Sequence, residues 1–194
     1  MKHLFFNRLD AHQPLTSSRL SYAKVDSIGQ TFKSDYDNLN IVSICIRNQS
    51  RVLTPFEFSL YEATSSSKPI RTLSFSGGNI DNQDCTRFQF DPVDDSKGKV
   101  YLATISAKPV GEGREYYSVY IEAHQGGDYR EGQAYLGTTP TDQDLHFKTF
   151  YRQDLQTVMS ESSSQLGGRL ISDPLFMIPY LIIIIYVIRR LIKK

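Results

Sequence analysis

The sequence predicts an all-β domain, a two-sheet jelly-roll-like β-sandwich of about nine or ten strands, followed by a flexible linker and one C-terminal transmembrane helix. Three observations predict it. Short runs alternate between apolar and polar residues with a period of two, stretches rich in Gly, Asp, Asn, Pro and Ser separate them, and an uncharged apolar run lies near the C-terminus. A closed barrel is the structural alternative.

The chain divides into five parts by composition. Residues 1–18 are polar and aperiodic, which predicts a loose N-terminal lead-in, and residues 19–152 form the β-sandwich domain. Residues 153–173 are rich in Ser and Gly and are expected to form a flexible linker. Residues 174–192 are expected to form the transmembrane helix, and residues 193–194 a basic cytoplasmic end.

Two of the predicted strands show the alternation most clearly. Val42, Ile44 and Ile46 share one face of a predicted strand over residues 39–47. The next strand, at 56–61, places Phe56, Phe58 and Leu60 inward and the residues between them outward. The remaining strands are expected at residues 20–24, 28–33, 70–75, 87–90, 100–106, 116–122, 134–136 and 145–151.

Composition excludes several classes of protein. The chain is 40% hydrophobic and 22% charged, which is ordinary for a folded domain and wrong for a disordered one. No basic patch indicates a nucleic-acid partner. Cys45 and Cys85 do not form a CxxC motif, so no zinc site is expected, and either a disulfide or two unpaired cysteines fits the pattern.

The apolar tail predicts a membrane anchor. Residues 175–188 carry no charge, and Arg189 and Arg190 can extend their charged ends to the interface so that the apolar helix continues to residue 192. A buried strand is the alternative, because residues 182–185 are all isoleucine. The residues expected to lie in or at the edge of the bilayer are Leu175, Ile182, Ile185, Ile188, Arg189 and Arg190.

The basic C-terminus predicts the orientation. Four Lys and Arg residues after the apolar run favour a cytoplasmic C-terminus, which places the preceding domain outside the cytoplasm. The N-terminal residues do not have the apolar stretch of a signal peptide. The export route therefore stays open between a truncated start, translocation of the N-terminus, and origin as a piece of a larger membrane protein.

The sequence offers one weak candidate for a binding site. Tyr116 and Tyr120 share a face of a predicted strand and could form an aromatic platform for sugar rings, although cross-strand packing on the sheet surface is the simpler interpretation. No catalytic motif, cofactor motif or metal site is expected. Asp91, Asp94 and Asp95 could attract calcium, but a solvated turn is the simpler interpretation.

Three segments resemble a family of bacterial envelope β-sandwich domains, which occur in surface proteins and appended to polytopic membrane proteins such as glycosyltransferases. The matching residues are Gly-Gln-Thr-Phe at 29–32 with Asn-Leu-Asn-Ile at 38–41, Phe-Gln-Phe-Asp-Pro-Val at 88–93 with Asp-Ser-Lys-Gly-Lys-Val-Tyr at 95–101, and residues 129–135 with 144–151. The resemblance implies a jelly-roll-type sandwich similar to carbohydrate-binding modules and supplies no catalytic residues.

These observations favour a non-enzymatic membrane-anchored envelope module that binds a glycan or a partner protein. The module would be accessory to glycosyl transfer at the membrane, and its expected partners are the lipid bilayer and an envelope glycan or a membrane protein. The alternative is a structural spacer, or a fragment of a larger polytopic membrane enzyme, with no ligand of its own. An independent hydrolase is disfavoured because no pair of catalytic carboxylates can be identified.

Overall fold

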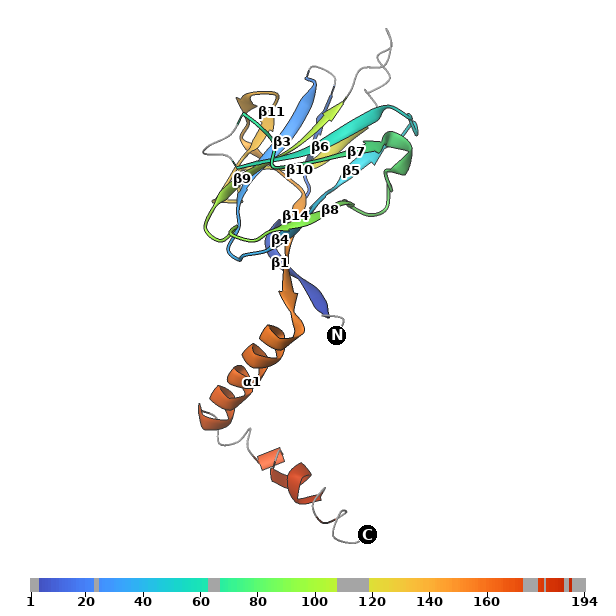
Figure 1. Cartoon of the computed structure of the whole chain (residues 1–194). Helices are drawn as coiled ribbons and strands as arrows, with labels where there is room; N and C mark the ends of the chain where they lie inside the picture. Colours follow the sequence, from blue (N-terminus) through green and yellow to red (C-terminus); the bar gives the residue numbers. More distant parts are fainter. Residues whose placement is uncertain are drawn as a thin grey trace. The chain divides into compact units, whose positions relative to one another are not determined.

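The structure is a computed structural model (Figure 1). It describes residues 4–22, 25–62, 67–107, 119–172, 178–179, 181–186 and 189. The chain divides into two compact units, one from Asn7 to Arg152 and one that joins the N-terminal residues through Phe6 to the segment from Gln153 onward. The first unit carries almost all of the strands, so the prediction of an all-β domain is confirmed.

The strands follow one another closely along the chain, with one short 3-10 helix (Gly77–Asn79) among them. They are β1 (Phe5–Gln13), β2 (Ser18–Ser21), β3 (Ser27–Lys33), β4 (Leu39–Ile44), β5 (Ile46–Asn48), β6 (Pro55–Glu62), β7 (Arg71–Ser76), β8 (Thr86–Val93), β9 (Val100–Ala107), β10 (Val119–Gln125), β11 (Ala134–Leu136), β12 (Thr139–Pro140), β13 (Gln143–Leu145) and β14 (Phe147–Asp154). The helix α1 (Leu155–Ser172) follows.

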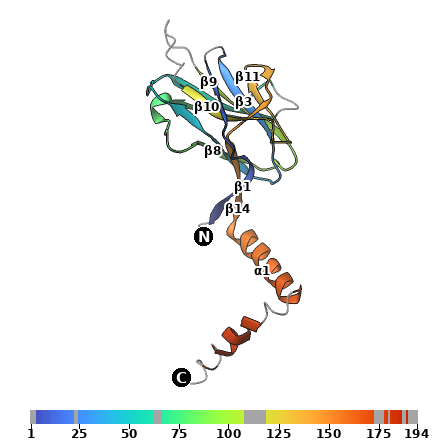
Figure 2. The ribbon, with the colours of Figure 1, turned by 180° about the vertical axis from the view of Figure 1, so that it is seen from behind.

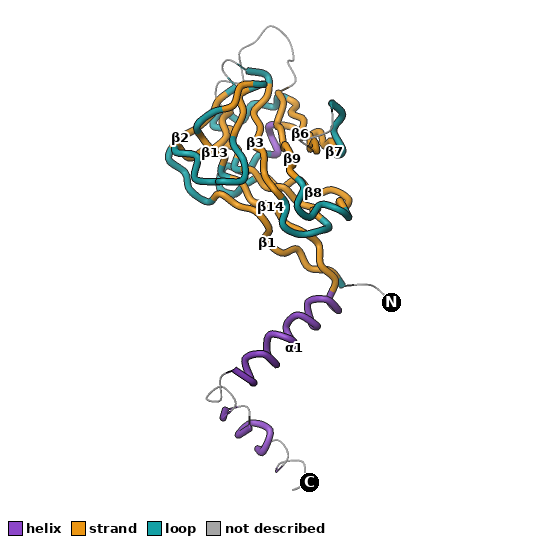
Figure 3. The backbone as a smooth tube through the Cα atoms, turned by 90° about the vertical axis from the view of Figure 1, so that its left-hand side faces the viewer, coloured by secondary structure: helices purple, strands orange, loops and turns teal. Residues whose placement is uncertain are grey.

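The described residues form fourteen strands in three antiparallel sheets, whereas the sequence predicted about nine or ten strands in two sheets. One six-stranded sheet has the order β12-β11-β3-β9-β6-β7, and a four-stranded sheet has the order β1-β14-β4-β8. A third sheet has the order β13-β10-β2, with β5 also pairing with β10. In Figure 3 the strands β3, β9, β6 and β7 of the large sheet can be followed side by side. Each sheet has two ends, so the described strands do not close into a barrel.

The two smaller sheets meet at a seam. β4 is interrupted at Cys45 before β5, and β13 is interrupted at His146 before β14. The backbone of the seam stays hydrogen-bonded, because the Cys45 amide donates to the His146 carbonyl at 3.1 Å and the His146 amide donates to the Glu122 carbonyl at 2.8 Å. The two smaller sheets therefore continue into one another. In Figure 2, which shows the ribbon from behind, β8 and β14 lie below β3 and β11.

The core lies between the large sheet and the two smaller ones. Phe56, Phe58 and Leu60 of β6 are fully buried, which confirms the inward face that the sequence predicted. Phe58 stacks on Phe88 of β8 with the ring centroids 4.5 Å apart. Because β6 and β8 belong to different sheets, this aromatic contact holds the two layers together, as expected of a β-sandwich.

A buried polar network joins segments that are far apart in the sequence. The Asp144 carboxylate is fully buried and accepts hydrogen bonds from the Gln30 side chain at 3.1 Å and the Tyr129 amide at 2.9 Å. Gln30 in turn accepts from the Leu145 amide at 2.8 Å. The first and last segments of the family resemblance therefore meet inside the domain, where their polar side chains satisfy buried backbone groups.

The central segment of the resemblance also has a structural role. The buried Ser96 hydroxyl accepts from the Leu39 amide at 3.1 Å and donates to the Tyr36 carbonyl at 2.9 Å. Gly98 has a φ of 76°, which is the positive value expected for the glycine of this turn. The segment at 95–101 thus ties the turn before β9 to the start of β4.

The ends of the domain differ from the sequence expectation. Part of the lead-in at 1–18 forms strand β1, which pairs with β14 at a sheet edge. The Ala11 amide donates to the Thr149 hydroxyl at 2.9 Å. The buried residues of β1 include Ala11 and Gln13, which are small or polar. This strand therefore lacks the apolar alternation from which the other strands were predicted.

The expected flexible linker also has a different structure. Most of residues 153–173 form the helix α1. The helix begins with a cap, because the Asp154 carboxylate accepts from the Thr157 amide at 2.8 Å. Serine is common in this segment, but Leu, Gln, Met and Glu also occur in it and favour a helix.

The predicted membrane anchor lies mostly outside the described residues. Leu175, Ile188 and Arg190 are not described, whereas Ile182, Ile185 and Arg189 are helical. Among the described residues, the structure contains no helix of the length and apolarity needed to cross a bilayer. The anchor stays a prediction of the sequence.

Candidate functional site

The tyrosine platform predicted from the sequence is described in part. Tyr116 lies outside the described residues. Tyr120 lies on β10 and is half-buried, with the Arg19 guanidinium 5.0 Å from its ring centroid. Because Arg19 stands over the Tyr120 ring, that face of the ring is occupied by a cation–π contact within the domain.

A second pair of tyrosines borders a groove on the outer face of the large sheet. The groove has a volume of about 420 Å³. Tyr61 of β6 and Tyr135 of β11 lie on either side of it, and β3 and β9 form its floor. The lining residues are Ser27, Thr31, Tyr61, Leu102, Thr104, Ser106 and Tyr135.

The strand register explains why these residues gather on one face. Tyr135 lies opposite Gly29, and Gly29 lies opposite Thr104 on the next strand. In the neighbouring row, Thr31 lies opposite Leu102, which lies opposite Tyr61. Since side chains alternate along a strand, these residues share the outer face while Ile28 and Phe32 point into the core.

Gly29 keeps the floor of the groove low. A Cβ atom at this position would lie 3.0 Å from the Ala103 carbonyl oxygen and 3.0 Å from the Thr104 Cγ2 atom. With glycine there, the strip between Tyr135 and Thr104 carries no side chain. At about 4.8 Å between neighbouring strands, the strands that carry the two tyrosines are roughly 14 Å apart.

Polar groups in the groove differ in their hydrogen bonding. The Thr31 hydroxyl is engaged with the Gln133 backbone, accepting from its amide at 2.9 Å and donating to its carbonyl at 3.2 Å. The Tyr135 hydroxyl accepts from the Gln133 side chain at 2.8 Å. The hydroxyls of Ser27, Ser106 and Tyr61 have no partner among the described residues, so they can bond a ligand.

The groove is uncharged. None of its lining residues ionises near neutral pH, and hydroxyl groups alternate with aromatic and aliphatic surface. Such a surface offers hydrogen bonds without an ion pair and can pack against apolar faces of a ligand. This arrangement suits a neutral, hydroxyl-rich ligand better than a charged one.

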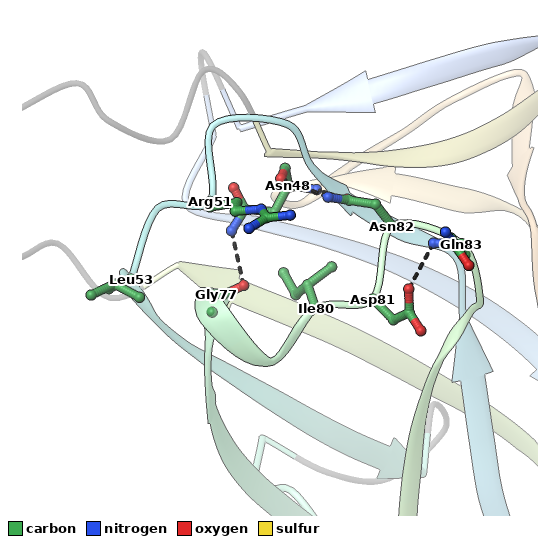
Figure 4. Close-up of a pocket in the computed structure, with 9 residues that line it drawn as sticks. Asn48, Arg51, Leu53, Gly77, Ile80, Asp81, Asn82 and Gln83 are labelled. Carbon is green, nitrogen blue, oxygen red and sulfur yellow. Dashed lines mark hydrogen bonds between the residues drawn. The ribbon is translucent and has the colours of Figure 1, made fainter.

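A second cavity lies among loops at one end of the domain (Figure 4). Its volume is about 380 Å³. Its walls are largely polar, and Figure 4 shows Ile80 between Gly77 and Asp81. The Asn48 side chain donates to the Val52 carbonyl at 2.9 Å and to the Gly77 carbonyl at 2.8 Å, so it organises the loops instead of facing a ligand.

The aspartates considered for calcium binding, at 91, 94 and 95, either pair with a lysine or face solvent. Asp95 forms a close ion pair with Lys99, at 2.6 Å, and the interaction lowers the pKa of the Asp95 carboxyl from its usual value. Asp91 and Asp94 are exposed. The simpler interpretation as a solvated turn agrees with these contacts.

His146 is half-buried and has two polar neighbours. Its Nδ1 atom lies 3.3 Å from Glu122 Oε2 and 3.0 Å from the Thr16 hydroxyl. Burial lowers the pKa of His146, and the neighbouring Glu122 opposes this shift. Cys45 and Cys85, which the sequence left open, are joined by a disulfide beside this histidine.

The comparisons with known proteins do not assign the chain to a family. No known protein family matches the chain, and no curated protein matches it. Among solved structures, the chain is similar to the clostridial cysteine protease Cwp84 after propeptide cleavage, with 10% sequence identity and a TM-score of 0.48. The match covers 76% of this chain and 40% of the protease chain, so this chain spans less than half of that protein.

Proposed function

We propose that this chain is a non-enzymatic, membrane-anchored envelope module that binds a neutral glycan in the groove between Tyr61 and Tyr135. The observation that carries the proposal is the pair of tyrosines across an uncharged floor of small and hydroxyl-bearing residues. Glycans present apolar ring faces and many hydroxyl groups. Tyrosine rings can pack against the former, and hydroxyl side chains can bond the latter.

The groove also has the rigidity that a binding surface needs. Its residues lie on paired strands and not on loops, and β3, β9 and β6 are joined over nearly their whole length. A surface fixed in this way loses little conformational entropy when a ligand binds. The resemblance to envelope sandwich domains that are similar to carbohydrate-binding modules supports the same proposal, since Gly29, Thr31 and Tyr135 lie in its quoted segments.

The membrane part of the proposal rests on the sequence of the tail. Residues 175–188 are uncharged and are followed by Arg189 and Arg190. An anchor in this position would keep the glycan-binding domain at the membrane surface with the C-terminus in the cytoplasm. A module placed there would suit an accessory role in glycosyl transfer at the membrane.

The test is a binding screen with matched tyrosine variants. The full chain in detergent micelles is titrated calorimetrically with neutral cello-, xylo-, malto- and chito-oligosaccharides. Where a ligand binds, Tyr61→Ala and Tyr135→Ala are each expected to weaken binding about tenfold or more, because each removes one ring surface. Tyr120→Ala is the control, since this half-buried tyrosine lies on β10 of another sheet.

The outcomes separate the two tyrosine sites. Loss of affinity in the Tyr61 and Tyr135 variants with retention in the Tyr120 variant supports the groove. Loss only in the Tyr120 variant would move the site to the platform predicted from sequence. Equal affinity in all three variants would rule out both.

A structural spacer, or a part of a larger polytopic membrane enzyme, is the second candidate. The observation that favours it is the convergence of the resembling segments on the buried contacts of Gln30, Asp144 and Ser96, which stabilise the fold. A domain retained for such contacts needs no ligand. Absence of binding to every oligosaccharide, with normal folding of the chain, would favour this candidate.

A further inference from the structure

Three side chains that can bind a metal meet at the seam between the two smaller sheets. The Sγ atoms of Cys45 and Cys85 and a ring nitrogen of His146 all lie within 4.8 Å of one another. We propose that reduction of the Cys45–Cys85 disulfide converts this cluster into a site for one Zn²⁺ ion. Two thiolates and one imidazole are ligands that zinc prefers, with water completing a tetrahedral set.

The two cysteines are held together by contacts that do not depend on the disulfide. Arg47 Nη1 donates to the Asp84 carbonyl at 2.9 Å, which links the residue two positions after Cys45 to the residue just before Cys85. Asn48 and Asn82 are joined twice, through the Asn48 amide at 2.6 Å and the Asn48 carbonyl at 2.9 Å. After reduction, these bonds keep the two sulfur atoms near each other.

The third ligand is oriented by its own neighbours. The backbone of His146 is bonded to Cys45 on one side and to Glu122 on the other. Its Nδ1 atom lies 3.3 Å from Glu122 Oε2, so the Nδ1–H tautomer donates a hydrogen bond there and leaves Nε2 for a metal. A carboxylate that orients a histidine in this way is common around protein zinc sites.

The charges near the cluster also suit a divalent ion. Two thiolates balance the charge of Zn²⁺, and Glu122 is already paired with Arg47 at 2.8 Å. The loaded site is therefore close to neutral, which limits the free-energy cost of placing an ion among one buried and two half-buried residues. Sequence reasoning dismissed zinc because the two cysteines are not in a CxxC motif, but the fold brings distant residues together.

A dithiol can act as the reductant that opens the Cys45–Cys85 disulfide. The reductant transfers two electrons and two protons to the disulfide, yielding two cysteine thiols and an oxidised, disulfide form of the reductant. Zinc then binds as the two thiols release their protons. A disulfide oxidant accepts two electrons from the metal-bound thiolates and is reduced to its dithiol, which restores the Cys45–Cys85 disulfide and releases the ion.

The experiment compares the oxidised and reduced full chain with the metal alone. After treatment with dithiothreitol and its removal without oxygen, the chain is titrated with Zn²⁺ by calorimetry and with Cd²⁺ by ultraviolet absorption. We expect one ion per chain and a thiolate-to-cadmium absorption band in the reduced form, and neither in the oxidised form.

Variants assign the ligands. Cys85→Ser is expected to remove the paired-thiolate site, and Cys45→Ala with Cys85→Ala tests both sulfurs together. Glu122→Gln should weaken zinc binding by about 10–100-fold, as loss of a group that orients a ligand usually does. His124→Gln is the matched control, since His124 pairs with Asp128 away from the sulfurs and should not matter.

Three results would overturn the proposal. One is a reduced chain that stays folded by circular dichroism but binds no zinc. Another is binding that survives in the double alanine variant or is lost equally in His124→Gln. The third is unfolding of the domain on reduction, since the proposal requires the Arg47 and Asn48 contacts to hold the site without the disulfide.

Discussion

Asp144 shows how one buried residue can hold several segments of the chain together. Its carboxylate bonds Gln30 and the Tyr129 amide, and no solvent reaches it. We expect Asp144→Ala to lower the free energy of unfolding by about 1–3 kcal/mol, because it leaves buried donors without an acceptor. Urea denaturation measures this change. The exposed Asp142→Ala is the control, and an equal effect of the two substitutions would contradict the role given to Asp144.

Gly132 is required by a close approach of the backbone. A Cβ atom there would overlap the Thr31 carbonyl oxygen, at 1.9 Å. We expect Gly132→Ala to destabilise the domain by about 1–3 kcal/mol, since backbone must shift to admit the methyl group. Thermal unfolding followed by circular dichroism tests it, and an unchanged melting temperature would show that the two segments are not in contact.

Individual residues were predictable where the reason for them was local. The positive φ of Gly98 follows from its place in an Asp-Ser-Lys-Gly turn, so local sequence is enough to explain it. The need for glycine at 132 depends on Thr31, which is remote in the sequence, so the residues next to Gly132 do not indicate it. The cluster of Cys45, Cys85 and His146 was missed for the same reason.

The start of α1 depends on a capping contact at the boundary of two elements. Asp154 accepts hydrogen bonds from both the amide and the hydroxyl of Thr157. The hydrogen bond from the Thr157 amide is the main cause that holds the pKa of Asp154 below its usual value. A lowered pKa means that the stabilisation is present above the unfolded value of 3.8 and is lost as the pH falls through the lower folded value. Asp154→Ala should remove this pH dependence.

Amide hydrogen exchange in the first turn of α1 measures the effect. Protection of the amides near Thr157 should fall as the pH drops below 3.8 in the native chain, after correction for intrinsic exchange rates. The Asp154→Ala variant should have low protection throughout. Equal protection in both proteins above that pH would contradict the cap.

Strands were predictable in proportion to their apolar alternation. β6 was recognised because Phe56, Phe58 and Leu60 alternate with other residues, whereas β1 was missed because its buried positions hold Ala11 and Gln13. Ser59 was expected to face solvent but is 3% exposed, since β9 and β7 flank β6 on both sides. Burial on the outer face depends on neighbours that a single strand does not reveal.

The groove belongs to the molecule as a whole, because four strands build it. Tyr61 and Tyr135 border one groove only through the pairing of β11, β3, β9 and β6. Alternation could place each tyrosine outward but could not bring the two together. The sequence therefore indicated an aromatic face only at Tyr116 and Tyr120 and did not identify the pair formed by Tyr61 and Tyr135.

Membrane attachment is tested on the whole chain as well. We expect the full chain to remain in membrane pellets after an alkaline wash, because the apolar residues after Ser172 would lie in the bilayer. A variant that ends at Ser172 should be released into the supernatant. Immunoblotting of the pellet and the supernatant measures where each protein is found. Release of the full chain by the wash would contradict the predicted anchor.

The most direct test of the glycan-binding groove is a nuclear magnetic resonance titration of the full chain with a neutral oligosaccharide from the binding screen. The proposal predicts that the amide signals that shift will map to β3, β9, β11 and the end of β6, with Gly29 and Thr104 among the largest changes. Shifts confined to β10 and β2, or no shifts at any ligand concentration, would contradict it.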